Sequence, residues 1–261
     1  MDASGMDWAN LLFRWLHVIA GVMWIGHLWF FNFVNGQVAK TFDADSKQKV
    51  VPELMPRALY WFRWGAAYTL ITGIFLLGLV YYMGGVLWAD AVNNPGNKVG
   101  MAVGLGVLVV GWVVYDNLWK ATANSQAVGT VISIVLISVA ACGLTHYGFS
   151  GRAVFIHCGS IFGFSMAANV WMRIWPAQRK IIAAIKAGDK PEPEWGALGG
   201  LRSKHNTYMS MPLLFLMISN HYPTVYGGAN VWALVAGIVV VGFLLTKFFY
   251  NKAASEAPSA Y

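Results

Sequence analysis

The sequence predicts an all-α integral membrane protein, a bundle of about seven transmembrane helices with its N-terminus outside and its C-terminus in the cytoplasm. Of its 261 residues, 57% are hydrophobic and 11% are charged, against roughly 25% charged in an average soluble domain. Long stretches contain no Asp, Glu, Lys or Arg, and runs of about 18 such residues can cross a ~30 Å hydrocarbon layer as helices. Lys and Arg are also concentrated in every second loop between these stretches, which predicts the orientation of the chain in the membrane.

The predicted spans follow the charge-free runs in order along the chain. Helices are expected because a segment inside lipid must satisfy its backbone hydrogen bonds internally. The seven spans are expected at about residues 9–36, 59–84, 99–119, 128–147, 152–176, 206–221 and 229–249. The whole chain, 1–261, is therefore expected to be one transmembrane domain, because its longest loop, roughly 177–205, is too short to build a soluble core.

The basic residues set the expected topology. With the N-terminus outside, Lys98 and Arg152 fall in outer loops and Arg14 and Arg63 fall within spans, whereas every other Lys and Arg falls on the cytoplasmic side. Such an excess of cytoplasmic Lys and Arg orients membrane proteins. The N-terminal residues lack a basic region, so the first apolar stretch is expected to be a retained span rather than a signal peptide.

The longest loop contains two further patterns. Its first part sets Ile181, Ile182 and Ile185 against basic neighbours, which predicts either an amphipathic helix on the inner membrane surface or a helical extension of span five. The stretch from Lys190 to Gly200 is rich in Pro and Gly, which predicts a turn-rich connector.

Charge and cysteine content exclude several classes of protein. The net charge of +7 comes from basic residues in loops between apolar runs, so the lipid bilayer is the expected partner and nucleic acid is not. The two cysteines, Cys142 and Cys158, form neither a CxxC pair nor a CxxCH motif. A disulfide framework and covalently attached c-type haem are therefore not expected in these residues.

The histidines carry the chemical signal, because ionisable side chains inside a bilayer are costly and mark functional sites by default. His17, His27 and His157 lie within spans, whereas His146, His205 and His221 lie at span ends. At a rise of about 1.5 Å per residue, His17 and His157 lie about 7–9 Å below the outer surface. His27 and His205 lie about 24 Å deep by the same rise.

Two histidines at one depth on different helices can ligate a haem iron from opposite faces. The sequence therefore predicts two haem b groups, one held by His17 and His157 and the other by His27 and His205. Gly21 and Gly26 would let a flat macrocycle approach the backbone of the first span. The alternative is that each imidazole hydrogen-bonds a neighbouring helix or a water.

Two arginines inside the spans are candidate partners for haem propionates. Arg14 precedes His17 by one helical turn on nearly the same face, and Arg63 lies near the inner end of the second span. Either guanidinium can instead extend to the lipid headgroups.

Two stretches carry a family resemblance. Residues 202–223, RSKHNTYMSMPLLFLMISNHYP, closely resemble the signature of the membrane domain of PuuD-type urate oxidases. Residues 11–27, LLFRWLHVIAGVMWIGH, are similar to the first helix of that domain. A looser likeness links the first span to the protoporphyrinogen oxidase family HemJ.

The resemblance implies a multi-pass oxidoreductase of the bacterial inner membrane that oxidises urate and passes electrons to a fused cytochrome c domain. These residues contain no CxxCH, so a separate c-type cytochrome or another redox subunit is the expected partner. His205, Asn206, His221 and Tyr222 match motif positions. We expect His221, Asn206 and Tyr222 to be catalytic and His205 to bind haem.

Two functions remain open from the sequence. The chain is either an enzyme that oxidises urate or a similar small reductant near the outer surface, or a non-catalytic dihaem b subunit of a larger respiratory complex. A retinal-binding receptor is excluded because the seventh span lacks a central lysine.

Overall fold

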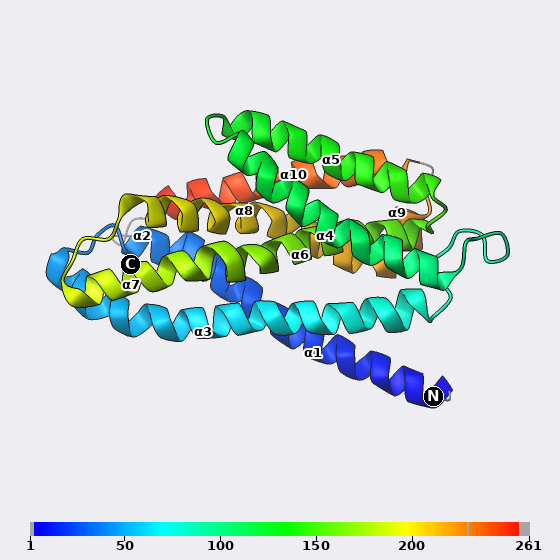
Figure 1. Ribbon diagram of the computed structural model, residues 1–261, viewed down its shortest axis with the longest axis horizontal. Helices are drawn as coiled ribbons and strands as arrows, with labels where there is room; N and C mark the ends of the chain where they lie inside the picture. Colours follow the sequence, from blue (N-terminus) through cyan, green and yellow to red (C-terminus); the bar gives the residue numbers. More distant parts are fainter. Residues whose placement is uncertain (1–2, 229, 256–261) are drawn as a thin grey trace.

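The computed structural model describes residues 3–228 and 230–255, and long helices run along one common axis (Figure 1). The helices are α1 (Ala3–Trp29), α2 (Gly36–Val38), α3 (Ala44–Leu76), α4 (Asn97–Ala121), α5 (Gln126–His146), α6 (Gly151–Asn169), α7 (Trp175–Ala187), α8 (Pro193–Ile218), α9 (Pro223–Tyr226) and α10 (Val231–Ser255). Three π-helical segments, η1 (Phe30–Asn35), η2 (Leu77–Tyr82) and η3 (Val170–Ile174), extend or join them, and a 3₁₀ turn, η4 (Ser219–His221), follows α8.

The prediction of an all-helical protein with several helices apolar enough to cross a membrane is confirmed. Six helical segments are long and apolar enough to cross a membrane: Gly5–Val38, Ala44–Tyr82, Asn97–Ala121, Gln126–His146, Gly151–Ala187 and Val231–Ser255. The seventh long helix, α8, contains Arg202, Asn206 and Ser210, and all three are buried inside the bundle. Its polar residues therefore face other helices, and its role as a seventh span stays a prediction.

The second span starts earlier than expected. α3 begins at Ala44 rather than near residue 59, and the Asp43 side chain caps it by accepting a hydrogen bond from the Ser46 backbone N–H. That N–H group holds the pKa of Asp43 below its usual value. The added turns form a charged helical extension beyond the apolar part of α3.

The long loop was partly predicted wrongly. α6, η3 and α7 form one continuous helix from Gly151 to Ala187, so the helical-extension alternative holds and no separate surface helix forms. The predicted connector at 190–200 is confirmed only up to Glu192, because α8 begins at Pro193, where proline suits the first helical turn. A Cβ at position 199 would lie 3.5 Å from the Ala177 side chain, in ordinary van der Waals contact, so α8 packs against α7 here.

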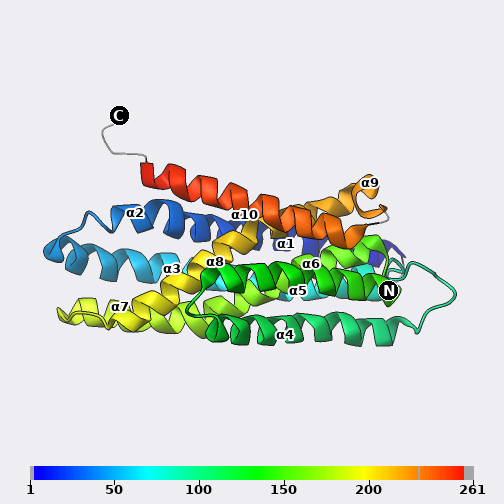
Figure 2. The same ribbon diagram turned by 90° about the horizontal axis from the view of Figure 1, so that it is seen from above.

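α6 is the central helix of the bundle. In the most apolar part of the continuous helix Gly151–Ala187, 67% of the residues are buried, against 22–33% in the corresponding parts of the other five candidate spans. α6 contributes to both apolar cores, one built with α4, α5 and α10 and one with α1, α3 and α8. Two views at right angles show α6 running between α3 and α10 (Figures 1 and 2).

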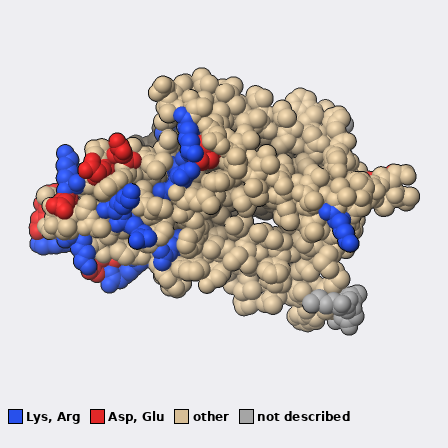
Figure 3. All heavy atoms as spheres, viewed as in Figure 1, with Lys and Arg blue, Asp and Glu red and all other residues tan. Residues whose placement is uncertain are grey.

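Charge separates the two ends of the bundle. Most Lys, Arg, Asp and Glu visible on the face shown in Figure 3 gather at the end formed by α2, the start of α3 and α7. We call this the charged end, and the opposite end, where α1 begins, the N-terminal end (Figure 1). This segregation is what a cytoplasmic charged end requires.

The orientation can be tested with single cysteines placed in a chain that has Ser at 142 and 158. Lys186→Cys lies in α7 at the charged end, and we expect an impermeant thiol reagent to leave it unlabelled in intact cells. The matched control Val92→Cys lies 85% exposed in the loop at the N-terminal end and should be labelled. Labelling of position 186 with protection of position 92 would invert the topology.

Candidate functional site

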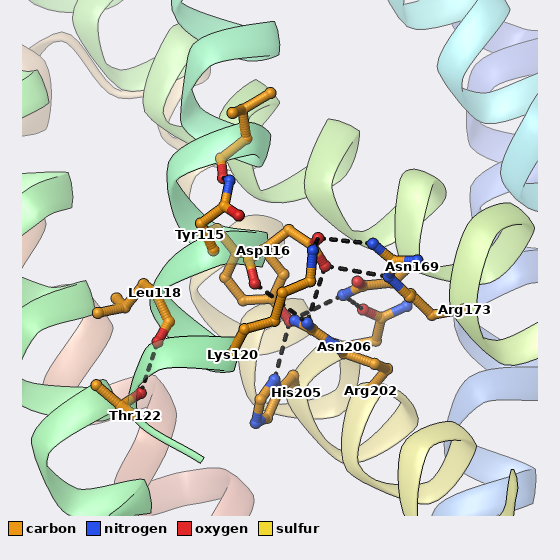
Figure 4. A network of polar contacts seen from close by, with 12 residues as sticks. Tyr115, Asp116, Leu118, Lys120, Thr122, Asn169, Arg173, Arg202, His205 and Asn206 are labelled. Carbon is orange, nitrogen blue, oxygen red and sulfur yellow. Dashed lines mark hydrogen bonds and ion pairs between the residues drawn. The ribbon is translucent and has the colours of Figure 1, made fainter.

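A network of charged and polar side chains lies between α4, η3 and α8 (Figure 4). The Asp116 carboxylate accepts from Arg173 Nη2 at 2.6 Å, from Arg202 Nη2 at 2.8 Å and from Lys120 Nζ at 2.7 Å. Asp116 and Arg202 are each 3% exposed. One buried carboxylate thus holds three cations from three parts of the chain, and the group keeps a net positive charge.

The position of each charge follows from the helices. Lys120 lies four residues after Asp116, on the same face of α4. Arg202 enters from the first half of α8 and its guanidinium stands 5.1 Å from the centre of the Tyr115 ring. Its Nε and Nη1 atoms are buried without a hydrogen-bond partner among the described residues, so the aromatic face is the contact that stabilises them.

Amide groups continue the network toward α6. Asn169 Nδ2 donates to the Tyr115 hydroxyl and to Asn206 Oδ1, both at 2.9 Å, and Asn206 Nδ2 donates to the Met166 carbonyl at 2.9 Å. The Tyr115 hydroxyl in turn lies 2.9 Å from His205 Nδ1. Asn169 and Asn206 are completely buried, so these bonds fix α4, α6 and α8 in one arrangement.

His205 lies on the wall of a cavity of about 410 Å³ between α4, α5, α6, α8 and α10, which we call the His205 cavity. Its ring centre lies 4.0 Å from that of Trp119. Most of the remaining wall is formed by valine, isoleucine, leucine and phenylalanine side chains.

A second cavity of about 600 Å³, the His17 cavity, lies between α1, α3, α4, α6 and α8 and is almost entirely apolar. His17 Nδ1 lies 3.0 Å from Thr72 Oγ1, whose own hydrogen is donated to the Tyr68 carbonyl. Nδ1 must therefore be the donor, which leaves the lone pair of His17 Nε2 free. Glycines on the α1 wall, Gly21 and Gly26, have no atom within 4 Å of the place a Cβ would take.

A smaller polar group, the Tyr81 cluster, lies at the N-terminal end. The Tyr81 hydroxyl and Arg152 Nε both donate to Asn220 Oδ1, the latter at 3.4 Å. Arg152 stands 5.8 Å from the Tyr81 ring centre, and Arg14 is near enough to interact electrostatically with Tyr81. No described carboxylate lies within ion-pair distance of either arginine, so the cluster is cationic.

His157 lies next to this cluster and is completely buried. Its Nδ1 donates to the Ala153 carbonyl at 2.7 Å, so its Nε2 accepts from the Tyr82 hydroxyl at 2.9 Å. A Cβ at position 104 would lie 2.6 Å from Nε2, which is why α4 carries glycine there. Both ring nitrogens of His157 are thus occupied.

The described contacts do not bring the members of either predicted histidine pair together. His17 contacts Thr72 of α3, whereas His157 contacts Tyr82 of η2. His27 Nδ1 bonds the Met23 carbonyl of its own helix at 2.7 Å, and His205 contacts Tyr115 of α4. The residues present suit one axial imidazole at each cavity, from His17 and from His205, while the paired ligation stays a prediction.

The other predicted site residues are placed as follows. Arg14 Nε donates to Asn10 Oδ1 at 2.7 Å, and Arg63 stands 4.1 Å from the Trp175 ring centre in an aromatic surround. His221 and Tyr222 are exposed at the N-terminal end, whereas Asn206 is buried in the Asp116 network on the other half of α8. The three residues expected to be catalytic therefore do not form one site.

Asp116, Tyr115, Asn169 and Arg173 were missed by the sequence reasoning. The signal for Asp116 was present, because a carboxylate within the span predicted at 99–119 is as costly as a buried histidine. Asn169 gave a weaker signal, since an uncharged amide in a predicted span commonly serves helix packing.

Removing the central carboxylate should destabilise the bundle. In Asp116→Asn the buried Arg202 guanidinium loses its ion pair. We expect the free energy of unfolding to fall by roughly 3–5 kcal/mol, as it does when other buried ion pairs are broken. Thermal unfolding in detergent measures this as a lower melting temperature. Asp45→Asn, which breaks an exposed pair with Lys49, is the control and should melt like the wild type. Equal melting of both variants would show that the network does not hold the helices.

A model of the urate oxidase N-terminal family matches residues 3–51 and 41–261 of the chain. This match confirms the resemblance seen in residues 202–223. No curated protein and no solved structure matches the chain.

Proposed function

The chain belongs to the urate oxidase N-terminal family, and we propose that it is a membrane oxidoreductase that oxidises urate or a similar small reductant and passes the electrons to a c-type cytochrome. The observation that carries the proposal is the Tyr81 cluster. There Arg152 and the Asn220 amide lie together, without a described carboxylate, in the half-buried surface at the N-terminal end, and Arg14 adds positive charge from α1.

The chemistry of the cluster suits a urate-like substrate. Such a molecule is a planar anion with ring N–H and carbonyl groups, and the flat guanidinium fork of Arg152 matches that edge in shape and charge. Asn220 accepts from Nε of Arg152 and the Tyr81 hydroxyl also interacts with this guanidinium, so a ligand would bind the remaining Nη hydrogens. Asn220 holds Nε and so orients the fork, and His221 and Tyr222 are its exposed neighbours in sequence.

Tyr81 and its neighbour Tyr82 connect the cluster to the buried interior of the helix bundle. Tyr81 binds Asn220, and its neighbour Tyr82 binds His157 in the fully buried part of α6. These contacts exclude water on the inner side of the cluster, because both tyrosine side chains are buried. A substrate held by Arg152 would therefore face water on one side only.

A haem b group is part of the proposal, with His17 as a protein ligand at the His17 cavity. The free lone pair of His17 Nε2, the apolar wall and the glycines of α1 support this assignment. When bound, the haem would take up electrons singly, which suits a one-electron acceptor such as cytochrome c. Thr72 keeps the His17 ring in the tautomer that such ligation needs.

The substrate site can be tested by urate oxidation with added cytochrome c. Arg152→Gln removes the charge and the fork, and we expect kcat/KM for urate to fall about 10–100-fold, the effect of one charge-assisted hydrogen bond. Arg179→Gln, in α7 at the charged end, is the matched control and should leave kcat/KM unchanged. Unchanged kcat/KM in Arg152→Gln would remove the Tyr81 cluster from the site.

The haem assignment can be tested by pyridine-haemochrome quantitation on purified variants. The cavity geometry predicts that His17→Ala loses haem, whereas His157→Ala keeps it because both nitrogens of His157 are already bonded. If His17 and His157 instead ligate the same haem, as their equal depth in the membrane predicts, both variants should lose haem equally. His146→Ala, at an exposed end of α5, is the control. Absence of haem from the wild type would end both assignments.

A non-catalytic dihaem subunit is the second candidate function. The observation that favours it is the presence of two cavities in different halves of the bundle, each lined by one histidine, His17 or His205. Such a subunit would bind two haems and show no urate turnover with any acceptor. The turnover assay above therefore separates the two functions.

A further inference from the structure

The His205 cavity has one polar end and a long apolar body. Its polar end is formed by Lys204, His205, Tyr115 and Trp119. The rest of the wall is mainly apolar, with side chains such as Val107, Ile137 and Ile161, and includes the small hydroxyl groups of Thr130, Ser133 and Ser165. A volume of about 410 Å³ lies within the range of small-molecule sites.

The polar end keeps one hydrogen-bonding atom for a ligand. His205 Nδ1 is held by the Tyr115 hydroxyl, which is itself fixed by Asn169, whereas Nε2 has no partner among the described residues. The Trp119 ring, 4.0 Å away from the His205 ring centre, adds an aromatic face at the same place. A planar ring with a hydrogen-bonding group therefore fits this end.

The apolar body opens toward the lipid. Val110, Val114 and Val139 line the cavity and are also 41–60% exposed on the outside of α4 and α5. A ligand can thus enter from the bilayer and leave an apolar tail between these two helices.

We propose that the His205 cavity binds an isoprenoid quinone of the membrane, with its ring against the cavity-facing edge of the His205 and Trp119 pair and its tail along the apolar wall toward the lipid. A lipid acyl chain lacks the hydrogen-bonding ring that the polar end matches. The quinone is a second electron acceptor of the protein, and this role rests on the oxidation proposed above.

The reaction balances in electrons and protons. The reductant gives two electrons and two protons as it takes up the oxygen of one water, and the quinone takes up two electrons and two protons. Two O–H bonds form, and each ring carbonyl becomes a hydroxyl. The protons come from water that reaches the polar residues Lys204 and Gln126 of the cavity wall.

Binding can be measured separately from turnover. Decyl-ubiquinone is titrated into the purified full chain in nanodiscs, and quenching of tryptophan fluorescence gives the dissociation constant. We expect His205→Ala to weaken binding about tenfold, the effect of one buried hydrogen bond. Ala140→Phe fills the cavity from α5 and should weaken binding at least as much, while His146→Ala, on the same helix and exposed, should bind like the wild type.

Three results would overturn the quinone site. These are equal affinity in the wild type, His205→Ala and Ala140→Phe, loss of haem in His205→Ala, or a co-purified lipid that decyl-ubiquinone does not displace. Weakened binding in both cavity variants, with no urate-driven reduction of quinone or cytochrome c, would uphold the site and reject the oxidation. Urate-driven reduction of cytochrome c without quinone binding would uphold the oxidation and reject the quinone site.

Discussion

The ion pairs of Asp116 are the constraint on which the interior of the bundle depends. A charged side chain inside a lipid-surrounded bundle is stable only when it is paired, and here one carboxylate pairs Lys120, Arg173 and Arg202. Because Arg202 is paired in this way, the polar first half of α8 can be buried among apolar helices. The same half of α8 carries His205 and Asn206, so the ion pairs also position the His205 cavity and the amide network.

α6 divides the interior into two compartments. Its residues line the His17 cavity through Ser160 and Gly163 and the His205 cavity through Ile161 and Ser165. Residues that follow one another along this helix thus serve different cavities, because successive side chains point in different directions around it. Together with α8, which lines both cavities as well, α6 keeps the two histidines apart.

The sequence predicted the apolar helices well and the site only in part. Charge-free runs located α4 and α5 to within a few residues, because apolar length is a property of the segment alone. The start of α8 was missed because the Pro and Gly residues of 190–200 are typical of turns, whereas Pro193 here occupies the first turn of a helix that packs against α7. Depth along a helix was read from residue spacing, but the direction in which His17 and His157 point depends on neighbouring helices. The spacing therefore gave no means to predict their hydrogen-bond partners.

The π-helical segment η2 has a consequence for how two adjacent tyrosines are used. In an α-helix, neighbouring side chains diverge by about 100°, whereas the wider turn of a π-helix inserts one residue into the spiral. Within η2 both Tyr81 and Tyr82 are buried, one on Asn220 of the η4 turn and the other on His157 of α6. The inserted residue rotates the directions of the side chains in η2 relative to those in the main part of α3. Deleting a single apolar residue upstream, without touching either tyrosine, would turn both phenols away from their partners.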